Sequence, residues 1–149
     1  MLNVIKHRLD IWQIEPIYWE HMAGIEKRIY ASSVARSLFE IIKIRASQIN
    51  KCVFCIDYHT HEALKHGETN RRIFALSAWQ ESPLFNTAEK SALQLAEQIT
   101  HISIEGVTDA CYDELKLHFS QAEIADLIIC ICHINFLNRI GITTKTVAL

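Results

Sequence analysis

Apolar residues recur three and four positions apart along most of the chain, which is the spacing of helices with one buried face. No segment alternates apolar and polar residues in the manner of a β-strand. No internal repeat, linker or low-complexity stretch divides the sequence. The pattern predicts one all-α domain over residues 1–149, with about six to seven helices. The predicted helices cover residues 16–29, 34–50, 52–67, 69–80, 109–118 and 120–139, and a further helix begins at residue 87.

Several of these helix ends are marked by residues that satisfy free backbone groups. Ser32 and Ser33 precede the second predicted helix and are expected to cap it. Ser120 and Glu123 have the spacing of a capping box, in which side chains and backbone donors bond reciprocally. Gly67 suits the left-handed backbone that often follows a helix end.

Composition limits the class of protein. Hydrophobic residues make up 50% of the 149 residues, and charged residues make up 21%. A packed core is therefore expected, and disorder as the main state is excluded. The formal net charge is −2 without a basic stripe, which argues against a nucleic-acid binder.

The amino-terminal residues and the longest apolar stretches bear on where the protein is located. The first ten residues carry charges where a signal peptide needs an apolar core. No stretch reaches the ~18 uninterrupted apolar residues typical of a membrane span. We therefore expect a cytoplasmic protein that does not bind a membrane. Thiols are kept reduced in that compartment, so the five cysteines indicate redox chemistry, metal binding or core packing rather than a disulfide framework.

Cys52, Cys55 and His59 fall along one face of a helix, because residues three and four apart are neighbours there. The positive end of the helix dipole favours the thiolate, which is the reactive form, and it favours the thiolate of Cys52 most. His59 lies one turn beyond Cys55 and is placed to accept its proton. The arrangement supplies an attacking thiol, a resolving thiol and a base.

Two other interpretations of these cysteines stay open at this point. A single Cys-x-x-Cys pair is also half of a structural zinc site, which His59, His61 or His66 could complete, although no familiar second ligand pair follows. Cysteine is in addition a common buried apolar residue, so both could pack in the core. Glu40 lies near Lys43 on a helical wheel, away from the apolar stripe, and this position predicts a solvated side chain.

The spacing of Glu40, Cys52, Cys55 and His59 resembles the active-site signature of the alkylhydroperoxidase AhpD-like family, within the carboxymuconolactone decarboxylase-like superfamily. The resemblance covers about residues 30 to 140 and implies an all-helical domain that forms homo-oligomers, as trimers or hexamers, through helix packing. Matching segments around the signature are 44–50, 59–63, 67–69, 76–79, 83–85 and 134–139.

The resemblance implies a role for each of the four residues. Cys55 would attack the hydroperoxide, and Cys52 would form the disulfide with it. Glu40 and His59 would form the proton relay, with Glu40 acting through water. The chain departs from the family pattern at Phe54, where characterised peroxidases carry a histidine, because phenylalanine cannot relay a proton. It also departs at two other positions, Lys51 in place of glycine and Leu137 in place of an aromatic residue.

The remaining cysteines and the tryptophans are expected to have structural roles. Cys130 and Cys132 are two apart and should point in different directions, so core packing is the preferred interpretation for both. Cys111 is also interpreted as structural, and His133 as a core or interface histidine with its hydrogen bonds satisfied. The tryptophans are expected to pack in the core or at subunit contacts; they are Trp12, Trp19 and Trp79.

The sequence therefore predicts a thiol-dependent peroxidase or disulfide reductase that acts on hydroperoxides. The resemblance implies a dithiol reductant protein, lipoyl or thioredoxin-like, and requires no metal or tightly bound cofactor. A carboxymuconolactone decarboxylase-type enzyme is one alternative, although true decarboxylases lack the paired cysteines. A non-enzymatic redox-responsive interaction protein is the other alternative.

Overall fold

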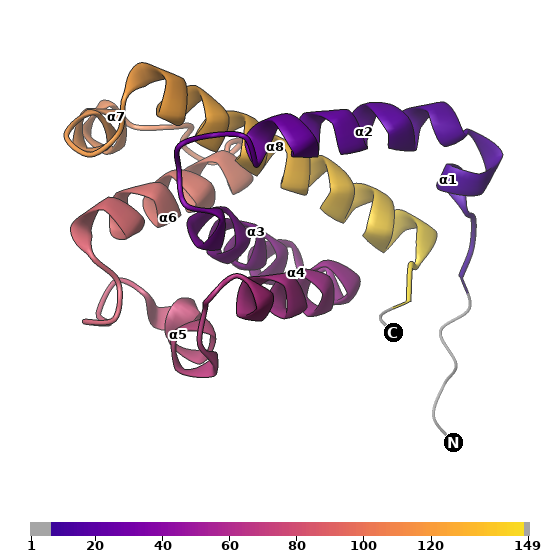
Figure 1. Cartoon of the computed structure of the whole chain (residues 1–149), viewed down its shortest axis with the longest axis horizontal. Coiled ribbons are helices and arrows are strands. Elements are labelled where there is room, and N and C mark those ends of the chain that lie inside the picture. The colour runs from indigo at the N-terminus through magenta and orange to yellow at the C-terminus, as the bar shows by residue number, and fades with distance from the viewer. Residues whose placement is uncertain (1–6, 148–149) are drawn as a thin grey trace.

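The computed structural model describes residues 7–147, so most of the charged amino-terminal segment lies outside the described residues. Within them the chain forms eight α-helices, one 3₁₀ helix and no strand (Figure 1). The all-α prediction is confirmed, and α1 is one helix more than the sequence predicts. The helices are α1 (Ile11–Ile14), α2 (Pro16–Ile29), α3 (Arg36–Asn50), α4 (Val53–Lys65), α5 (Asn70–Ala75), η1 (Leu76–Ala78), α6 (Thr87–Thr100), α7 (Asp109–Lys116) and α8 (Gln121–Thr144).

Most helix ends follow the local signals in the sequence. The predicted capping box at the start of α8 forms, since Ser120 accepts from the backbone N–H of Glu123 and the Glu123 side chain accepts in return. Gly67 follows α4 with φ +94°, in the left-handed region where glycine carries no steric penalty. The predicted helix over 69–80 divides into α5 and the 3₁₀ turn η1.

The prediction that Ser32 and Ser33 cap the second helix was wrong. α3 begins at Arg36 with Ala35 at its N-cap, and no side chain caps it. The serines have other partners, because the chain turns here between α2 and α3. Ser32 Oγ accepts from the backbone N–H of Val34, and Ser33 Oγ donates to the Glu123 carboxylate at the start of α8.

The central element is α3, which packs against α4, α6 and α8 (Figure 1). Nine of its 15 residues are buried, so the helix is covered on more than its apolar stripe. Its buried residues include the polar side chains of Glu40, Lys43 and Ser47 as well as aliphatic ones. A helix enclosed in this way brings polar groups into the interior, where they need partners.

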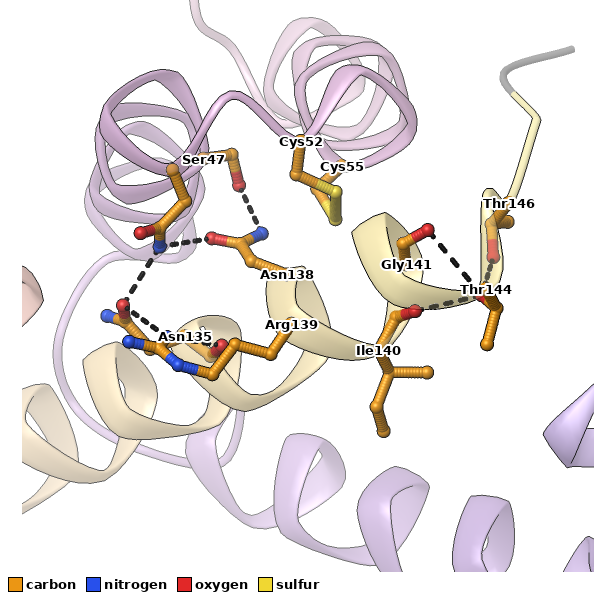
Figure 2. The surroundings of a disulfide bond; sticks show 11 residues. Ser47, Cys52, Cys55, Asn135, Asn138, Arg139, Ile140, Gly141, Thr144 and Thr146 are labelled. Carbon is orange, nitrogen blue, oxygen red and sulfur yellow. Dashed lines mark hydrogen bonds between the residues drawn. A yellow bond between two sulfur atoms is a disulfide. The ribbon is translucent and has the colours of Figure 1, made fainter. Parts of the chain in front are cut away.

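A ladder of amide and hydroxyl groups joins the end of α3 to α8 (Figure 2). Asn138 donates to Ser47 Oγ at 2.9 Å, and Asn50 donates to the Oδ1 atoms of both Asn135 and Asn138 at 2.9 Å. Asn135 donates in turn to Thr100 Oγ1 on α6 at 3.0 Å. These bonds fix α8 directly beside the turn that carries the cysteine pair.

Among the described residues, α8 is the one helix long and apolar enough to cross a membrane by length and composition. Core helices pass the same criterion, and 44% of its most apolar window is buried inside the fold. It continues five residues beyond the predicted end, to Thr144, and Lys145 then takes a left-handed backbone with φ 55°. The backbone N–H of Arg8 donates to the Thr144 carbonyl at 2.8 Å, which brings the segment before α1 against the end of α8.

Candidate active site

The cysteine pair lies at the sharp turn between α3 and α4. Lys51 follows α3 as its C-cap and has a left-handed backbone, with φ 61°. Glycine adopts this backbone without steric penalty, in agreement with the glycine of the family pattern at this position. The backbone N–H of Cys52 then donates to the Ser47 carbonyl at 3.0 Å. Cys52 is the N-cap of α4, and Cys55 lies in its first turn.

The structure joins Cys52 and Cys55 in a disulfide, with their Cα atoms 5.4 Å apart. Both side chains are buried. Gly141 of α8 faces the two sulfurs (Figure 2), and a Cβ atom there would lie 3.3 Å from Cys52 Sγ and 3.8 Å from Cys55 Sγ. The missing side chain at Gly141 therefore leaves room for the sulfur pair.

His59 and Glu40 are in direct contact, since His59 Nδ1 lies 2.8 Å from Glu40 Oε2. Glu40 is 0% exposed, so the prediction of a solvated side chain was wrong. The reason is tertiary: the face of α3 that carries it is covered by α4, while Tyr30 at the end of α2 donates to its carboxylate. The two side chains are therefore bonded directly to each other.

A second set of polar groups extends from Glu40 to α2. The Tyr30 hydroxyl donates to Glu40 Oε1 at 2.5 Å and accepts from Lys43 Nζ at 2.5 Å. Lys43 is 1% exposed and donates also to Glu26 Oε1 at 2.8 Å. Arg36 lies at the edge of this set, with Nε 3.6 Å from Glu40 Oε1 and its guanidinium over the Tyr30 ring. We call Glu26, Tyr30, Glu40, Lys43 and His59 the buried polar cluster.

The cluster sets the protonation states of the acid and the base. Burial opposes charge on Glu40, but the His59 hydrogen bond and the Lys43 charge outweigh it and hold the pKa of Glu40 below its ordinary value. Burial lowers the pKa of His59, and the bond to Glu40 offsets only part of this effect. Glu40 is thus ionised while His59 is neutral. Because a carboxylate only accepts hydrogen bonds, Nδ1 of His59 carries the proton and Nε2 is left as an acceptor.

A cavity of about 360 Å³ opens beside the cysteine pair. Cys55 and His59 line it, together with Glu26 of the buried polar cluster. Cys52 is not among the described residues that line it. The remaining walls are mainly apolar and come from α1, α2, α4 and α8; they include Trp12, Trp19, Phe54, Tyr58, Leu137 and Ile140.

The other cysteines lie elsewhere in the structure. Cys111 and Cys130 are buried, as predicted, whereas Cys132 is exposed, so the prediction of core packing was wrong for it. Residues two apart on a helix point to different sides, which accounts for the difference between Cys130 and Cys132. Burial raises the pKa of the Cys130 thiol to about 12.

His133 also differs from its prediction. It is buried, but neither ring nitrogen has a hydrogen-bond partner among the described residues, so its hydrogen bonds are not satisfied. Of the tryptophans, Trp79 is buried as expected, whereas Trp19 is half exposed and lines the cavity with Trp12. Within residues 7–147, no three His, Cys, Asp or Glu side chains are grouped so that they could hold a metal ion.

Several residues of this site were not predicted from the sequence. Glu26, Tyr30 and Lys43 enter it from two helices, and Trp12 enters it from the short helix α1. A signal was present for Lys43, because it follows Glu40 by one helical turn and the two side chains can pair there. The sequence held no local signal for Tyr30 or Glu26, since only the packing of α2 on the other helices brings them near Glu40.

The sequence is similar to one family model and to a bacterial relative. The model of the carboxymuconolactone decarboxylase family matches residues 17–98. Uncharacterized protein YdfG of Bacillus subtilis (strain 168) is 41% identical over 138 residues, which cover 93% of this chain and 94% of that protein.

Two solved structures show the same fold. ATU0492 of Agrobacterium tumefaciens, a protein of unknown function described as a candidate antioxidant defence protein AhpD, is 30% identical with a TM-score of 0.92, covering 97% of this chain and 99% of its own. An alkylhydroperoxidase AhpD core protein of Ralstonia eutropha JMP134, an uncharacterized peroxidase-related protein, is 15% identical with a TM-score of 0.82, covering 93% and 74%. The chain therefore belongs to the carboxymuconolactone decarboxylase family and has an AhpD-like fold.

Proposed function

We propose that this protein is a thiol-dependent peroxidase, of the peroxidase/disulfide reductase class, that reduces hydroperoxides with Cys55 and Cys52; an external dithiol then reduces the resulting disulfide. One observation carries the proposal: Cys55 lines a cavity together with His59, and His59 is hydrogen-bonded to the buried, ionised Glu40. A thiol, a neutral base and a carboxylate that orients the base are the parts of an activated nucleophile.

The cavity supports Cys55 as the attacking thiol. The helix dipole favours the thiolate of Cys52, but Cys55 lines the cavity and Cys52 does not. Cys52 is then the resolving thiol, since it is the partner of Cys55 in the disulfide. Phe54 replaces the histidine of characterised relatives, so His59 and Glu40 carry the proton without it.

The proposed cycle begins with proton transfer from Cys55. His59 Nε2 takes the proton of the Cys55 thiol, and the thiolate attacks the terminal oxygen of the hydroperoxide. The O–O bond breaks, Cys55 becomes a sulfenic acid, and the alkoxide takes the proton from His59 and leaves as an alcohol. The Cys52 thiol then displaces hydroxide from Cys55, so that a disulfide and one water form. An external dithiol reduces the disulfide by exchange and becomes a disulfide itself.

The test of this function is thiol titration with peptide mapping, before and after one equivalent of hydroperoxide is added to reduced protein. We expect loss of two thiols and a Cys52–Cys55 bond, while Cys111, Cys130 and Cys132 remain free. Absence of this bond in folded, peroxide-treated protein would contradict the proposal. Formation of the bond without sustained turnover by any dithiol would favour the redox-responsive interaction protein instead.

The physiological setting is part of the proposal. We propose a cytoplasmic homo-oligomer, a trimer or hexamer, recycled by a lipoyl or thioredoxin-like dithiol protein. Large apolar side chains exposed on α2 and α8 support assembly by helix packing; they include Ile17, Tyr18, Ile129 and Phe136. Light scattering after size-exclusion chromatography measures the assembly, and a monomer at micromolar concentration would contradict it.

A further inference from the structure

The walls of the cavity beside Cys55 carry two aromatic pairs from separate parts of the chain. Trp12 of α1 and Trp19 of α2 have ring centroids 5.4 Å apart, inclined at 58°. Phe54 and Tyr58 of α4 are stacked, with centroids 6.2 Å apart and ring planes at 15°. All four residues line the cavity. Aromatic side chains bind planar apolar groups by stacking and edge contacts, so the walls suit a ring.

The size of the cavity also bears on the substrate. A water molecule takes about 30 Å³ of liquid volume, and hydrogen peroxide has only one heavy atom more. The cavity has about 360 Å³, within the range of pockets that enclose small organic ligands. Hydrogen peroxide would therefore leave most of the aromatic wall in contact with water, whereas a one-ring compound would cover it.

The charge of the cavity restricts the substrate further. Glu26 contributes a carboxylate to the wall, and no lysine or arginine is among the described residues that line the cavity. Burial opposes charge on Glu26, but the charge and hydrogen bond of Lys43 outweigh it and lower the pKa of Glu26, so the carboxylate is ionised. Lys43 itself is buried behind this wall at 1% exposed. A ligand carboxylate would find repulsion from Glu26 and no cation to pair with.

We propose that this cavity binds a neutral organic hydroperoxide carrying one aromatic ring, with the ring against Trp12, Trp19, Phe54 and Tyr58 and the peroxide group toward Cys55. The inference rests on the proposed function and adds to it the substrate class. Trp12 precedes the residues 17–98 that match the family model, so part of this specificity lies outside the matched segment.

Binding is tested first, without turnover. The probe is 2-phenyl-2-propanol, the neutral alcohol left when cumene hydroperoxide is reduced, and its matched control is the same alcohol with a para carboxylate. Two proteins are used, Cys55→Ser and the oxidised parent with its disulfide intact. Trp12 and Trp19 line the cavity whereas Trp79 is buried outside it, so tryptophan fluorescence reports on the cavity.

We expect saturable fluorescence changes with the neutral alcohol and binding at least about tenfold weaker for the carboxylate. Trp12→Ala should weaken binding of the neutral alcohol. The control Phe74→Ala, at a side chain 78% exposed on α5, should leave it unchanged. Equal binding of the two alcohols, or no saturable binding in either protein, would overturn the inference.

Turnover is tested second and separates the two proposals. With cumene hydroperoxide we expect kcat/KM to exceed that for its para-carboxylate and for hydrogen peroxide by about tenfold or more. Trp12→Ala should lower kcat/KM for cumene hydroperoxide more than that for hydrogen peroxide, and Phe74→Ala should leave the ratio unchanged. If all three peroxides oxidise the Cys52–Cys55 pair equally well, the inference fails and the proposed function stands. If none oxidises the pair, the proposed function fails, and the alcohol binding alone decides whether the cavity selects a neutral ring.

Discussion

Cys52 and Cys55 lie at the start of α4, whereas Cys130 and Cys132 lie in the middle of α8. The first two are three residues apart and share a disulfide. The second two are two residues apart, and one is buried while the other is exposed. Separation along a helix thus decides which pair can act together, since residues three apart share a face and residues two apart do not.

The two regions have charged neighbours in common, but these neighbours have different consequences for Cys55 and for Cys130. Lys43, Glu40 and Glu26 affect the pKa of Cys130 as well as that of His59. Burial dominates at Cys130 and keeps it a thiol, whereas Cys55 lines a cavity beside a neutral base. Proximity to the buried polar cluster is therefore not sufficient for reactivity. Access from the cavity and a base at one helical turn are also required.

The largest expected effect is at Cys55. Cys55→Ser should lower hydroperoxide consumption to the level of buffer, because the nucleophile is removed and Cys130 is held as a thiol. Cys52→Ser should consume one equivalent and stop, with a sulfenic acid on Cys55 that dimedone traps. Consumption is followed by peroxide assay and the adduct by mass spectrometry. The matched control is Cys132→Ser, an exposed thiol that should keep parental activity. Parental consumption by both Cys55→Ser and Cys52→Ser would show that the roles are wrongly assigned.

The second effect is at Glu40. Burial lowers the pKa of His59, and the Glu40 carboxylate raises it in part. Glu40→Gln removes that carboxylate, so His59 becomes a weaker base and its ring is held less firmly. We expect the rate of Cys55 oxidation to fall by about 10²–10⁴-fold, the usual contribution of a positioned base. Stopped-flow mixing of reduced protein with hydroperoxide measures it. Glu105→Gln, at an exposed acid, is the control, and an equal loss there would contradict a specific role for Glu40.

Glu40 marks the boundary between the site residues that can be predicted from the sequence and those that cannot. Cys52, Cys55 and His59 belong to one helix, so their common face could be predicted from spacing alone. The all-α fold could be predicted for the same reason, because helical periodicity and caps are local. The burial of Glu40 could not, because it depends on α4 packing over a face of α3 that looks solvated on a helical wheel.

The positions of the other unpredicted site residues depend still more on tertiary structure. Tyr30 and Glu26 lie on or next to α2, and their contact with Lys43 spans 13 and 17 residues of sequence. Trp12 reaches the cavity only because α1 precedes a helix that packs on α8. Nothing in local composition distinguishes these residues from ordinary surface or core positions.

The third effect, smaller than that of Glu40→Gln, is at Tyr30. Burial raises the pKa of Glu40, and hydrogen bonds from His59 and Tyr30 lower it, so Tyr30→Phe lets this pKa rise. A hydrogen bond to a charged group contributes about 1.5–3 kcal/mol, and with half of this contribution expressed in the transition state we expect a rate loss of about three- to tenfold. The acid limb of the pH–rate profile should move to higher pH. Tyr112→Phe on α7 is the control, and an unshifted profile in Tyr30→Phe would contradict the role of Tyr30.

The smallest effect compares the two buried histidines, His59 and His133. Burial lowers both pKa values. His59 is bonded to the Glu40 carboxylate, whereas His133 has no side-chain partner within residues 7–147, and the nearby Met22 backbone offsets part of the effect of burial at His133 without a hydrogen bond of ordinary geometry. An unsatisfied buried polar group costs about 1–3 kcal/mol, so His133→Leu should raise the free energy of unfolding by about 1 kcal/mol. Urea denaturation at pH 7.5 measures this gain.

The pH dependence of that gain supplies the control. A histidine whose folded pKa is lowered binds its proton more readily in the unfolded state, so the parent should lose stability as pH falls below about 6.5, the ordinary value for histidine. His133→Leu removes one of the two groups responsible, and its advantage over the parent should therefore grow between pH 7.5 and pH 5.5. The rate of Cys55 oxidation should stay at the parental value, because His133 lies with the α8 cysteines and not among the residues that line the cavity. A stability gain that is constant with pH would mean that His133 is satisfied in solution, and the contrast between the two histidines would then lie in reactivity alone.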